Sequence, residues 1–289
     1  MKPIIVITGP TAVGKTALSI DLARKFNGEI INADASQMRR DLNIGTAKIS
    51  IDEMKNVKHH LIDFLDPLDK FSIKEFQKIG RDLIDKIEIP FIVGGSGLYI
   101  QALITDYQLD TSSRDESQFD NLSNEELHTL LKEQDSEAAV KIHPNNRRRV
   151  SRYLEIIRDR GKVQTSHPIP LYDVLTICLT TDRKILYDNI NKRCDQMFVN
   201  GWIEECLDLK NKGIDLSLIK EIGYADINQY LEGNVSFGDV VELIKQKQRH
   251  YAKRQITWFK NKMDCTFVDL GKEDPNEIYY LIENHLKSK

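Results

Sequence analysis

Residues 9–16, with the sequence GPTAVGKT, constrain the fold of this chain more than any other feature, because they satisfy the phosphate-binding pattern GxxxxGK[ST]. An apolar run at residues 4–8 precedes them and a helical pattern at residues 15–26 follows, which is the strand–loop–helix context that the motif needs. Such a loop turns backbone N–H groups toward phosphate oxygens at the positive end of a helix. The sequence therefore predicts a P-loop, and it leaves open whether a nucleotide or another compound carries the phosphates.

The loop combines backbone donors with two side chains of different chemistry. Lys15 is predicted to neutralise phosphate charge, and the hydroxyl of Thr16 is predicted to bind Mg²⁺. The residues predicted to bind the diphosphate or triphosphate of a substrate are Gly9, Thr11, Ala12, Val13, Gly14, Lys15 and Thr16.

Strand and helix patterns alternate through the first hundred residues or so. Further strands are expected at residues 29–33, 60–64 and 90–93, and a helix opens at Ser72, where Glu75 completes a capping-box spacing. Alternating strands and helices indicate βαβ units and hence a parallel sheet. We therefore predict an α/β protein with a P-loop NTPase-like parallel sheet flanked by helices.

The character of the sequence changes near residue 106. Residues 106–137 contain ten acidic residues against two Lys or Arg, and their helical patterns are short. We expect a small all-helical insertion lobe at residues 111–170, between a first part of the core at 1–110 and its continuation at 171–289. The continuation is expected to hold a strand at residues 172–180 and helices at 183–200, 202–212 and 237–262.

Composition excludes several classes of protein. The net charge of −3 argues neither for a nucleic-acid binder nor for an acidic tail. The four cysteines form no CxxC pair, so neither a zinc site nor a disulfide framework is indicated. No apolar stretch approaches the roughly 20 residues that a membrane-spanning helix needs. We expect a cytoplasmic protein without a membrane partner.

Two acidic residues at predicted strand ends are candidates to act beside the P-loop. Asp34 follows the strand at residues 29–33, and Asp63 lies near the end of the run at residues 60–64. Ligands of α/β proteins bind at the carboxyl ends of the strands, so either carboxylate could be functional. The alternative for each is a capping or turn role.

Several longer motifs resemble one family over nearly the whole chain, the bacterial tRNA dimethylallyltransferases, also called tRNA isopentenyltransferases. The matching segments are DASQ at 34–37 with NIGTAK at 43–48, HHLID at 59–63, FIVGGSGLY at 91–99, IHPN at 142–145 and QRHYAKRQITWF at 248–259. The chain departs from the family pattern at Arg39, where the family usually has Tyr, and at Ser96, where it usually has Thr.

The resemblance implies transfer of a dimethylallyl group from dimethylallyl diphosphate, with Mg²⁺, to the exocyclic N6 amine of the adenosine 3′-adjacent to the anticodon in tRNA. The P-loop would then hold the diphosphate of the prenyl donor, although its shape is that of an ATP site. Two alternatives from the residues stay open. One is a P-loop small-molecule or nucleoside kinase, in which Asp34 would activate a hydroxyl. The other is a noncatalytic RNA-binding nucleotide switch, against which the lack of a guanine-specificity motif argues.

The resemblance also implies roles for individual residues. Asp34 corresponds to the base that accepts a proton from the attacking amine, and Gln37 to a residue that positions the target adenine. Arg193 matches an arginine that stabilises the leaving diphosphate, with a surface salt bridge as the alternative. The predicted catalytic residues are Asp34, Thr16, Ser96 and Arg193.

Two basic clusters offer what a tRNA partner needs. Residues 245–262 hold seven Lys or Arg and no acidic residue, and helical spacing puts Lys245, Arg249 and Lys253 on one stripe. The other cluster lies at residues 147–152, and the resemblance implies that it contacts the anticodon stem-loop. A solvated face is the alternative for each cluster. The residues predicted to bind tRNA are Asp34, Ala35, Ser36, Gln37, Arg148, Arg149, Arg152, Arg249 and Lys253, and a monomer is favoured.

Overall fold

The computed structural model describes residues 1–107, 116–160 and 168–288. Contacts divide the chain into two compact units. The larger unit combines Met1–Tyr107 with Pro170–Lys289, and the smaller unit is Gln108–Ile169. Each unit has its own hydrophobic core.

A six-stranded parallel sheet forms the centre of the larger unit. Its strands lie in the order β3-β2-β4-β1-β5-β6, so β1 is flanked by β4 and β5. The strands are β1 (Pro3–Thr8), β2 (Glu29–Asn32), β3 (His59–His60), β4 (Pro90–Val93), β5 (Asp173–Thr180) and β6 (Thr266–Asp269). The predicted α/β class with a P-loop NTPase-like parallel sheet is confirmed.

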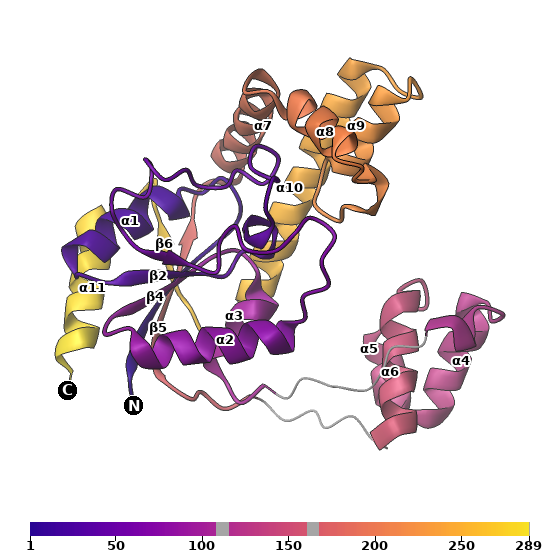
Figure 1. Ribbon diagram of the computed structural model, residues 1–289. Helices are drawn as coiled ribbons and strands as arrows, with labels where there is room; N and C mark the ends of the chain where they lie inside the picture. Colours follow the sequence, from indigo (N-terminus) through magenta and orange to yellow (C-terminus); the bar gives the residue numbers. More distant parts are fainter. Residues whose placement is uncertain (108–115, 161–167, 289) are drawn as a thin grey trace. The chain divides into compact units, whose positions relative to one another are not determined.

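Helices cover both faces of this sheet (Figure 1). The helices α1 (Lys15–Lys25) and α11 (Pro275–Lys287) bury apolar residues in one core cluster, and α2 (Ile73–Lys86) and α3 (Gly97–Ile104) bury theirs in another. Side chains alternate between the faces of a strand, so Ile5 of β1 joins the first cluster and Ile4 the second. Burial on both faces explains the continuous apolar run of β1.

A helical region of the larger unit packs around a third core cluster. It contains α7 (Arg183–Val199), α8 (Trp202–Asn211), the 3₁₀ helix η3 (Leu216–Leu218), α9 (Tyr224–Leu231) and α10 (Phe237–Lys262). Trp202 and Tyr224 are fully buried at its centre. The helix α10 continues from this cluster to the sheet, where Ala252 and Phe259 enter the two sheet-side clusters. This helix therefore connects the helical region to the P-loop side of the molecule.

The smaller unit is helical in the part that the structure describes. It contains η2 (Glu116–Phe119), α4 (Asn124–Gln134), α5 (Ser136–Lys141) and α6 (Arg147–Arg160). Its core includes Leu127 and Leu131 of α4 and Leu154 of α6. Among the described residues of the whole chain, no helix is both long and apolar enough to cross a membrane.

The strand predicted at residues 60–64 is wrong beyond its first residue. β3 ends at His60, because Leu61 and Asp63 have positive φ angles of 58° and 55°, which a strand cannot contain. The amide of Asn32 donates to the carbonyl oxygen of Leu61 at 2.8 Å and holds this turn against the neighbouring strand. Asp63 is therefore not a carboxylate at the tip of a strand.

Candidate functional site

The P-loop leaves β1 in a conformation that its glycines permit. Gly9 has a φ of 139°, and a Cβ atom there would lie 2.5 Å from the carbonyl oxygen of Leu179 on β5. Gly14 has a φ of 102° and directly precedes α1, and Ala12 between them is also left-handed, with a φ of 62°. The loop thus needs glycine at both ends, for close approach at Gly9 and for chain direction at both.

Lys15 folds back over the loop that carries it. Its Nζ donates to the carbonyl oxygens of Gly9 at 3.0 Å and Pro10 at 2.8 Å. The pKa of Lys15 is lowered to about 8, chiefly by burial; the negative charge of Asp34 opposes this shift, and the positive charge of Arg193 adds to it. The ammonium group of Lys15 therefore lies near Asp34 and Arg193, two residues that the sequence predicts for the same site.

Arg193 reaches the P-loop from the middle of α7. Its guanidinium donates to the hydroxyl of Thr11 at 2.5 Å. Burial lowers the pKa of Arg193, and the carboxylate of Asp34 acts in the opposite direction. This contact with the P-loop disfavours the alternative of a surface salt bridge, and it adds a second cation beside Lys15.

Asp34 is held by the residue that ends β2. The side chain of Asn32, only 5% exposed, accepts from the backbone N–H of Asp34 at 3.0 Å and donates to its carbonyl oxygen at 3.0 Å. One carboxylate oxygen of Asp34 accepts from the N–H of Ser36 at 3.1 Å and caps the 3₁₀ helix η1 (Ala35–Met38). Asp34 does cap a helix, as the alternative reading held, and the same geometry fixes its carboxylate near Lys15 and Arg193.

A buried glutamine joins the P-loop to the glycine-rich turn after β4. Gln255 of α10 accepts from the N–H of Thr11 at 2.9 Å and donates to the carbonyl oxygen of Gly95 at 3.0 Å. A Cβ atom on Gly95 would lie 2.1 Å from this amide, so a larger residue here would displace the side chain of Gln255. In the same turn the hydroxyl of Ser96 accepts from the N–H of Ala35 at 3.4 Å. The turn therefore touches both the P-loop and the segment that carries Asp34.

Tyr251, one helical turn before Gln255, completes the buried side of this group. Burial raises the pKa of its phenol, and the negative charge of Asp34 raises it further. Hydrogen bonds with Ser96 and Gln255 act in the opposite direction. Tyr251 therefore stays neutral and adds a hydroxyl close to Asp34.

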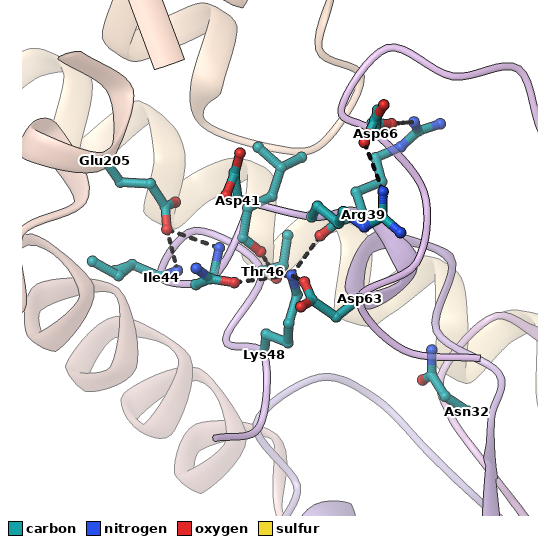
Figure 2. Close-up of polar contacts among 12 residues, drawn as sticks. Asn32, Arg39, Asp41, Ile44, Thr46, Lys48, Asp63, Asp66 and Glu205 are labelled. Carbon is teal, nitrogen blue, oxygen red and sulfur yellow. Dashed lines mark hydrogen bonds and ion pairs between the residues drawn. The ribbon is translucent and has the colours of Figure 1, made fainter. Parts of the chain in front are cut away.

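The side chains of Lys48 and Arg39 hold the segment 39–48 in place (Figure 2). Lys48, whose side chain is 6% exposed, donates to the carbonyl oxygen of Arg39 and to the carboxylate of Asp63, each at 2.5 Å. Arg39 forms an ion pair with Glu221 at 2.9 Å, and its guanidinium also donates to three backbone carbonyls between Asp66 and Asp69. Arg39, the departure from the family pattern, thus has a structural role. Asp63 holds this segment through Lys48.

Gln37, to which the resemblance assigns the positioning of the target adenine, lies in the same region. Its backbone oxygen accepts from the N–H of Asp63 at 3.0 Å, and its side-chain amide donates to the carbonyl oxygen of Ala47 at 3.1 Å. Both ends of Gln37 are therefore held by the chain that follows it.

The three basic residues predicted to form a stripe on α10 differ in their partners and in their exposure. Lys245 has a side chain that is 14% exposed and forms ion pairs with Asp195 at 2.7 Å and Glu242 at 3.1 Å. Arg249 donates to Asn191 of α7 at 2.6 Å and lines a cavity of about 600 Å³ with that helix. Lys253 is exposed. The three residues do share one helix at the expected spacing of four, but Lys245 is paired with acidic side chains, and Lys253 alone of the three is exposed.

The second basic cluster lies on α6 of the smaller unit. Arg148 and Arg149 are exposed. Arg147 donates to the carbonyl oxygen of Leu122 at 2.7 Å, and Arg152 pairs with the buried Glu155 at 2.8 Å. Arg147 therefore stabilises the lobe itself, and Arg148 and Arg149 present their charge to solvent.

The loop can accommodate a metal ion that arrives with a diphosphate. Among the described residues, no group of three or more His, Cys, Asp or Glu is arranged to hold a metal by itself. Thr16, in contrast, is exposed at the start of α1. Mg²⁺ commonly binds through substrate phosphates, waters and one or two protein oxygens, so a hydroxyl at this position fits such an ion.

Sequence reasoning missed Asn32, Tyr251 and Gln255 as parts of the site. Asn32 is a polar residue at the end of an apolar strand, which is a usable signal. Gln255 and Tyr251 lie in a helix whose basic residues drew attention to RNA binding, and only the fold brings them to the P-loop.

Comparisons with known proteins agree on one family. Residues 37–262 match the family model described as IPP transferase. The tRNA dimethylallyltransferase of Halalkalibacterium halodurans is 42% identical, covering 100% of this chain and 98% of its own. That of Bacillus subtilis is 43% identical over 93% of this chain and 91% of its own.

Solved structures give the same result. A full-length tRNA isopentenylpyrophosphate transferase from Bacillus halodurans superposes with a TM-score of 0.77 at 40% identity, covering 99% of this chain and 97% of that one. A eukaryotic dimethylallyltransferase acting on tRNA gives a TM-score of 0.85 at 27% identity, covering 100% of this chain and 80% of that one.

Proposed function

This chain belongs to the IPP transferase family, and on that premise we propose that it transfers a dimethylallyl group from dimethylallyl diphosphate to the N6 amine of the adenosine 3′-adjacent to the anticodon in tRNA. The observation that carries the proposal is the meeting of one carboxylate, Asp34, with two cations, Lys15 and Arg193, at a P-loop. A base for the acceptor and charge for the leaving group are the two requirements of this reaction.

The P-loop side stabilises the leaving group. As the bond between C1 of the dimethylallyl group and its oxygen breaks, the electron pair stays on the diphosphate. The backbone N–H groups of the loop, Lys15 and Arg193 can stabilise this charge as it develops. Lys15 is available for this because its hydrogen-bond partners among the described residues are the carbonyl oxygens of Gly9 and Pro10, not a carboxylate.

The Asp34 side serves the acceptor. An exocyclic aryl amine is a weak nucleophile, so proton removal by a positioned base accelerates its attack. The nitrogen forms a bond to C1 and its proton passes to the Asp34 carboxylate, which Asn32 and the cap of η1 hold in place. Ser96 and Tyr251 place further hydroxyl groups beside this carboxylate.

Mg²⁺ fits the donor side of this scheme. We propose that Thr16 binds it through the hydroxyl group, with the diphosphate oxygens and water as the remaining ligands. When bound, the ion would neutralise part of the diphosphate charge.

The tRNA contacts that we propose involve residues 34–37 at the target base and basic side chains at the phosphate backbone. The latter are Arg148, Arg149, Arg152, Arg249 and Lys253. The target adenine must leave its stack to reach the Asp34 carboxylate, so extrusion of the nucleotide is expected. Because phosphate contacts release counterions, binding should weaken steeply with salt. A cytoplasmic location and a monomeric state stay predictions.

The test is a mass measurement on tRNA. With dimethylallyl diphosphate and Mg²⁺ but no ATP, the tRNA should gain one C5 unit on the adenosine beside the anticodon. Asp34→Asn, which keeps the size of the side chain and the cap of η1, should lose about 10²–10⁴-fold in rate and keep its affinity for tRNA. The comparisons do not favour the kinase and nucleotide-switch alternatives. A requirement for ATP would revive the kinase and contradict prenyl transfer.

A further inference from the structure

A carboxylate of the helical region receives four hydrogen bonds. Glu205 of α8 accepts from the backbone N–H groups of Asn43 at 2.8 Å, Ile44 at 2.6 Å and Gly45 at 3.2 Å. It also accepts from the phenol of Tyr224 at 2.7 Å. Figure 2 shows Glu205 pointing at the turn that contains Ile44. Three successive N–H groups around one anion form the kind of concavity that binds anions in proteins.

This turn is tightly built and closely packed. The N–H of Lys48 donates to the carbonyl oxygen of Asn43 at 2.9 Å, and that of Ala47 to Ile44 at 3.0 Å. A Cβ atom on Gly45 would lie 2.2 Å from the indole nitrogen of Trp202, so the turn rests directly on α8. The carboxylate of Glu205 therefore holds the N–H groups of residues 43–45 in one fixed arrangement on α8.

The end of the turn reaches the target-facing side of the site. The carbonyl oxygen of Ala47 accepts from the side-chain amide of Gln37 at 3.1 Å. Gln37 lies three residues after Asp34, within the 3₁₀ helix that Asp34 caps. A displacement of the turn would consequently move the amide that is proposed to face the target adenine.

We propose that Glu205 is a positioning residue for the tRNA substrate, acting through residues 43–47 on the amide of Gln37. This inference rests on the proposed function, because the role of Gln37 does. The amide of Gln37 can contact an adenine edge only in a fixed orientation, since adenine recognition by an amide is directional. The hydrogen bonds of the Glu205 carboxylate go to residues 43–45 and to Tyr224, so we expect its effect on the acceptor and not on the prenyl donor.

The decisive variant is Glu205→Gln, which keeps the shape of the side chain and removes its charge. The glutamine side chain has only one oxygen that can accept hydrogen bonds. Its NH₂ group would face backbone N–H or phenol donors that a carboxylate oxygen accepts from in the wild-type protein. Hydrogen bonds to charged groups are the strong ones. We expect the KM for tRNA to rise about tenfold while the KM for dimethylallyl diphosphate changes less than about twofold.

Glu204→Gln is the matched control, because Glu204 is the exposed neighbour on the same helix and the charge change is identical. It should leave both KM values unchanged. Tyr224→Phe removes one of the four donors and keeps the three N–H contacts, so it should have a smaller effect on the KM for tRNA than Glu205→Gln. Glu205→Asp, which restores the charge on a shorter side chain, should recover part of the loss.

A double-mutant cycle tests the route through Gln37. If Glu205 acts on tRNA through Gln37, the effects of Glu205→Gln and Gln37→Ala on kcat/KM for tRNA should be strongly non-additive. Additive effects, or equal increases in both KM values, would overturn the proposal. If Glu205→Gln fails to fold by circular dichroism, Glu205→Asp takes its place in the cycle. Failure of the wild-type protein to prenylate tRNA would instead count against the proposed function.

Discussion

The P-loop, residues 9–16, and the acceptor segment, residues 34–48, both leave the carboxyl edge of the same sheet, yet different parts of the chain hold them. The P-loop is shaped by its glycine conformations and by the hydrogen bonds of Lys15 with the carbonyl oxygens of Gly9 and Pro10 in the same loop. The acceptor segment depends on carboxylates brought from elsewhere, namely Asp63, Glu205 and Glu221.

Under the proposed function, the difference follows from what each region would bind. Any diphosphate presents the same oxygens, so a short loop with converging N–H groups suffices. A base extruded from tRNA must be met in one orientation, and a segment without regular structure reaches such precision only when outside partners hold it. The side chains of Arg193 and Gln255 nevertheless form hydrogen bonds with Thr11 of the P-loop from outside it, and these two contacts are where the comparison can be tested.

Arg193 should show the largest effect. Arg193→Gln removes a cation from the leaving group, so kcat should fall about 10²–10³-fold, as for other residues that stabilise transition-state charge. The affinity for tRNA, measured by filter binding, should be unchanged, and Arg193→Lys should recover part of the rate. A wild-type kcat in Arg193→Gln would mean that the P-loop stabilises the leaving diphosphate without a cation from another part of the chain.

Gln255→Met should have the next largest effect. It leaves the N–H of Thr11 and the carbonyl of Gly95 without their side-chain partner, which should cost about 1–3 kcal/mol in the free energy of unfolding. Denaturant titration measures this loss, and the KM for dimethylallyl diphosphate should rise with it. Gln246→Met, an exposed glutamine on the same helix, is the control. An unchanged stability and KM would show that the loop shapes itself alone.

The smallest expected effect is a pH dependence on the donor side. The pKa of Lys15 is lowered to about 8, so its charge is present below that pH and is lost as the pH rises through it. At saturating tRNA, kcat/KM for dimethylallyl diphosphate should fall about tenfold between pH 7 and pH 9. Lys15→Arg should remove the inflection, because a guanidinium does not titrate there. A flat wild-type profile would contradict the assignment.

Prediction from sequence succeeded where the pattern and the structure are both local. The buried strand β1 and the long helix α10 follow from apolar runs and helical periodicity. In contrast, β6 has four residues with two exposed, and it was missed together with α9 and α11. The strand expected through Asp63 was wrong because a tertiary contact, Asn32 with Leu61, stabilises a left-handed turn that apolar residues alone do not indicate.

The sequence by itself determined the phosphate loop, the α/β class and the family, because each depends on residues that are neighbours in the chain. Only the tertiary structure decided which side chains complete the site. Gln255 meets Thr11 across 244 positions, and Glu205 meets Ile44 across 161. No local pattern records such contacts, since a glutamine or glutamate that is hydrogen-bonded to a distant segment has the same sequence signature as a solvated one. The fold alone turns these residues toward the two loops.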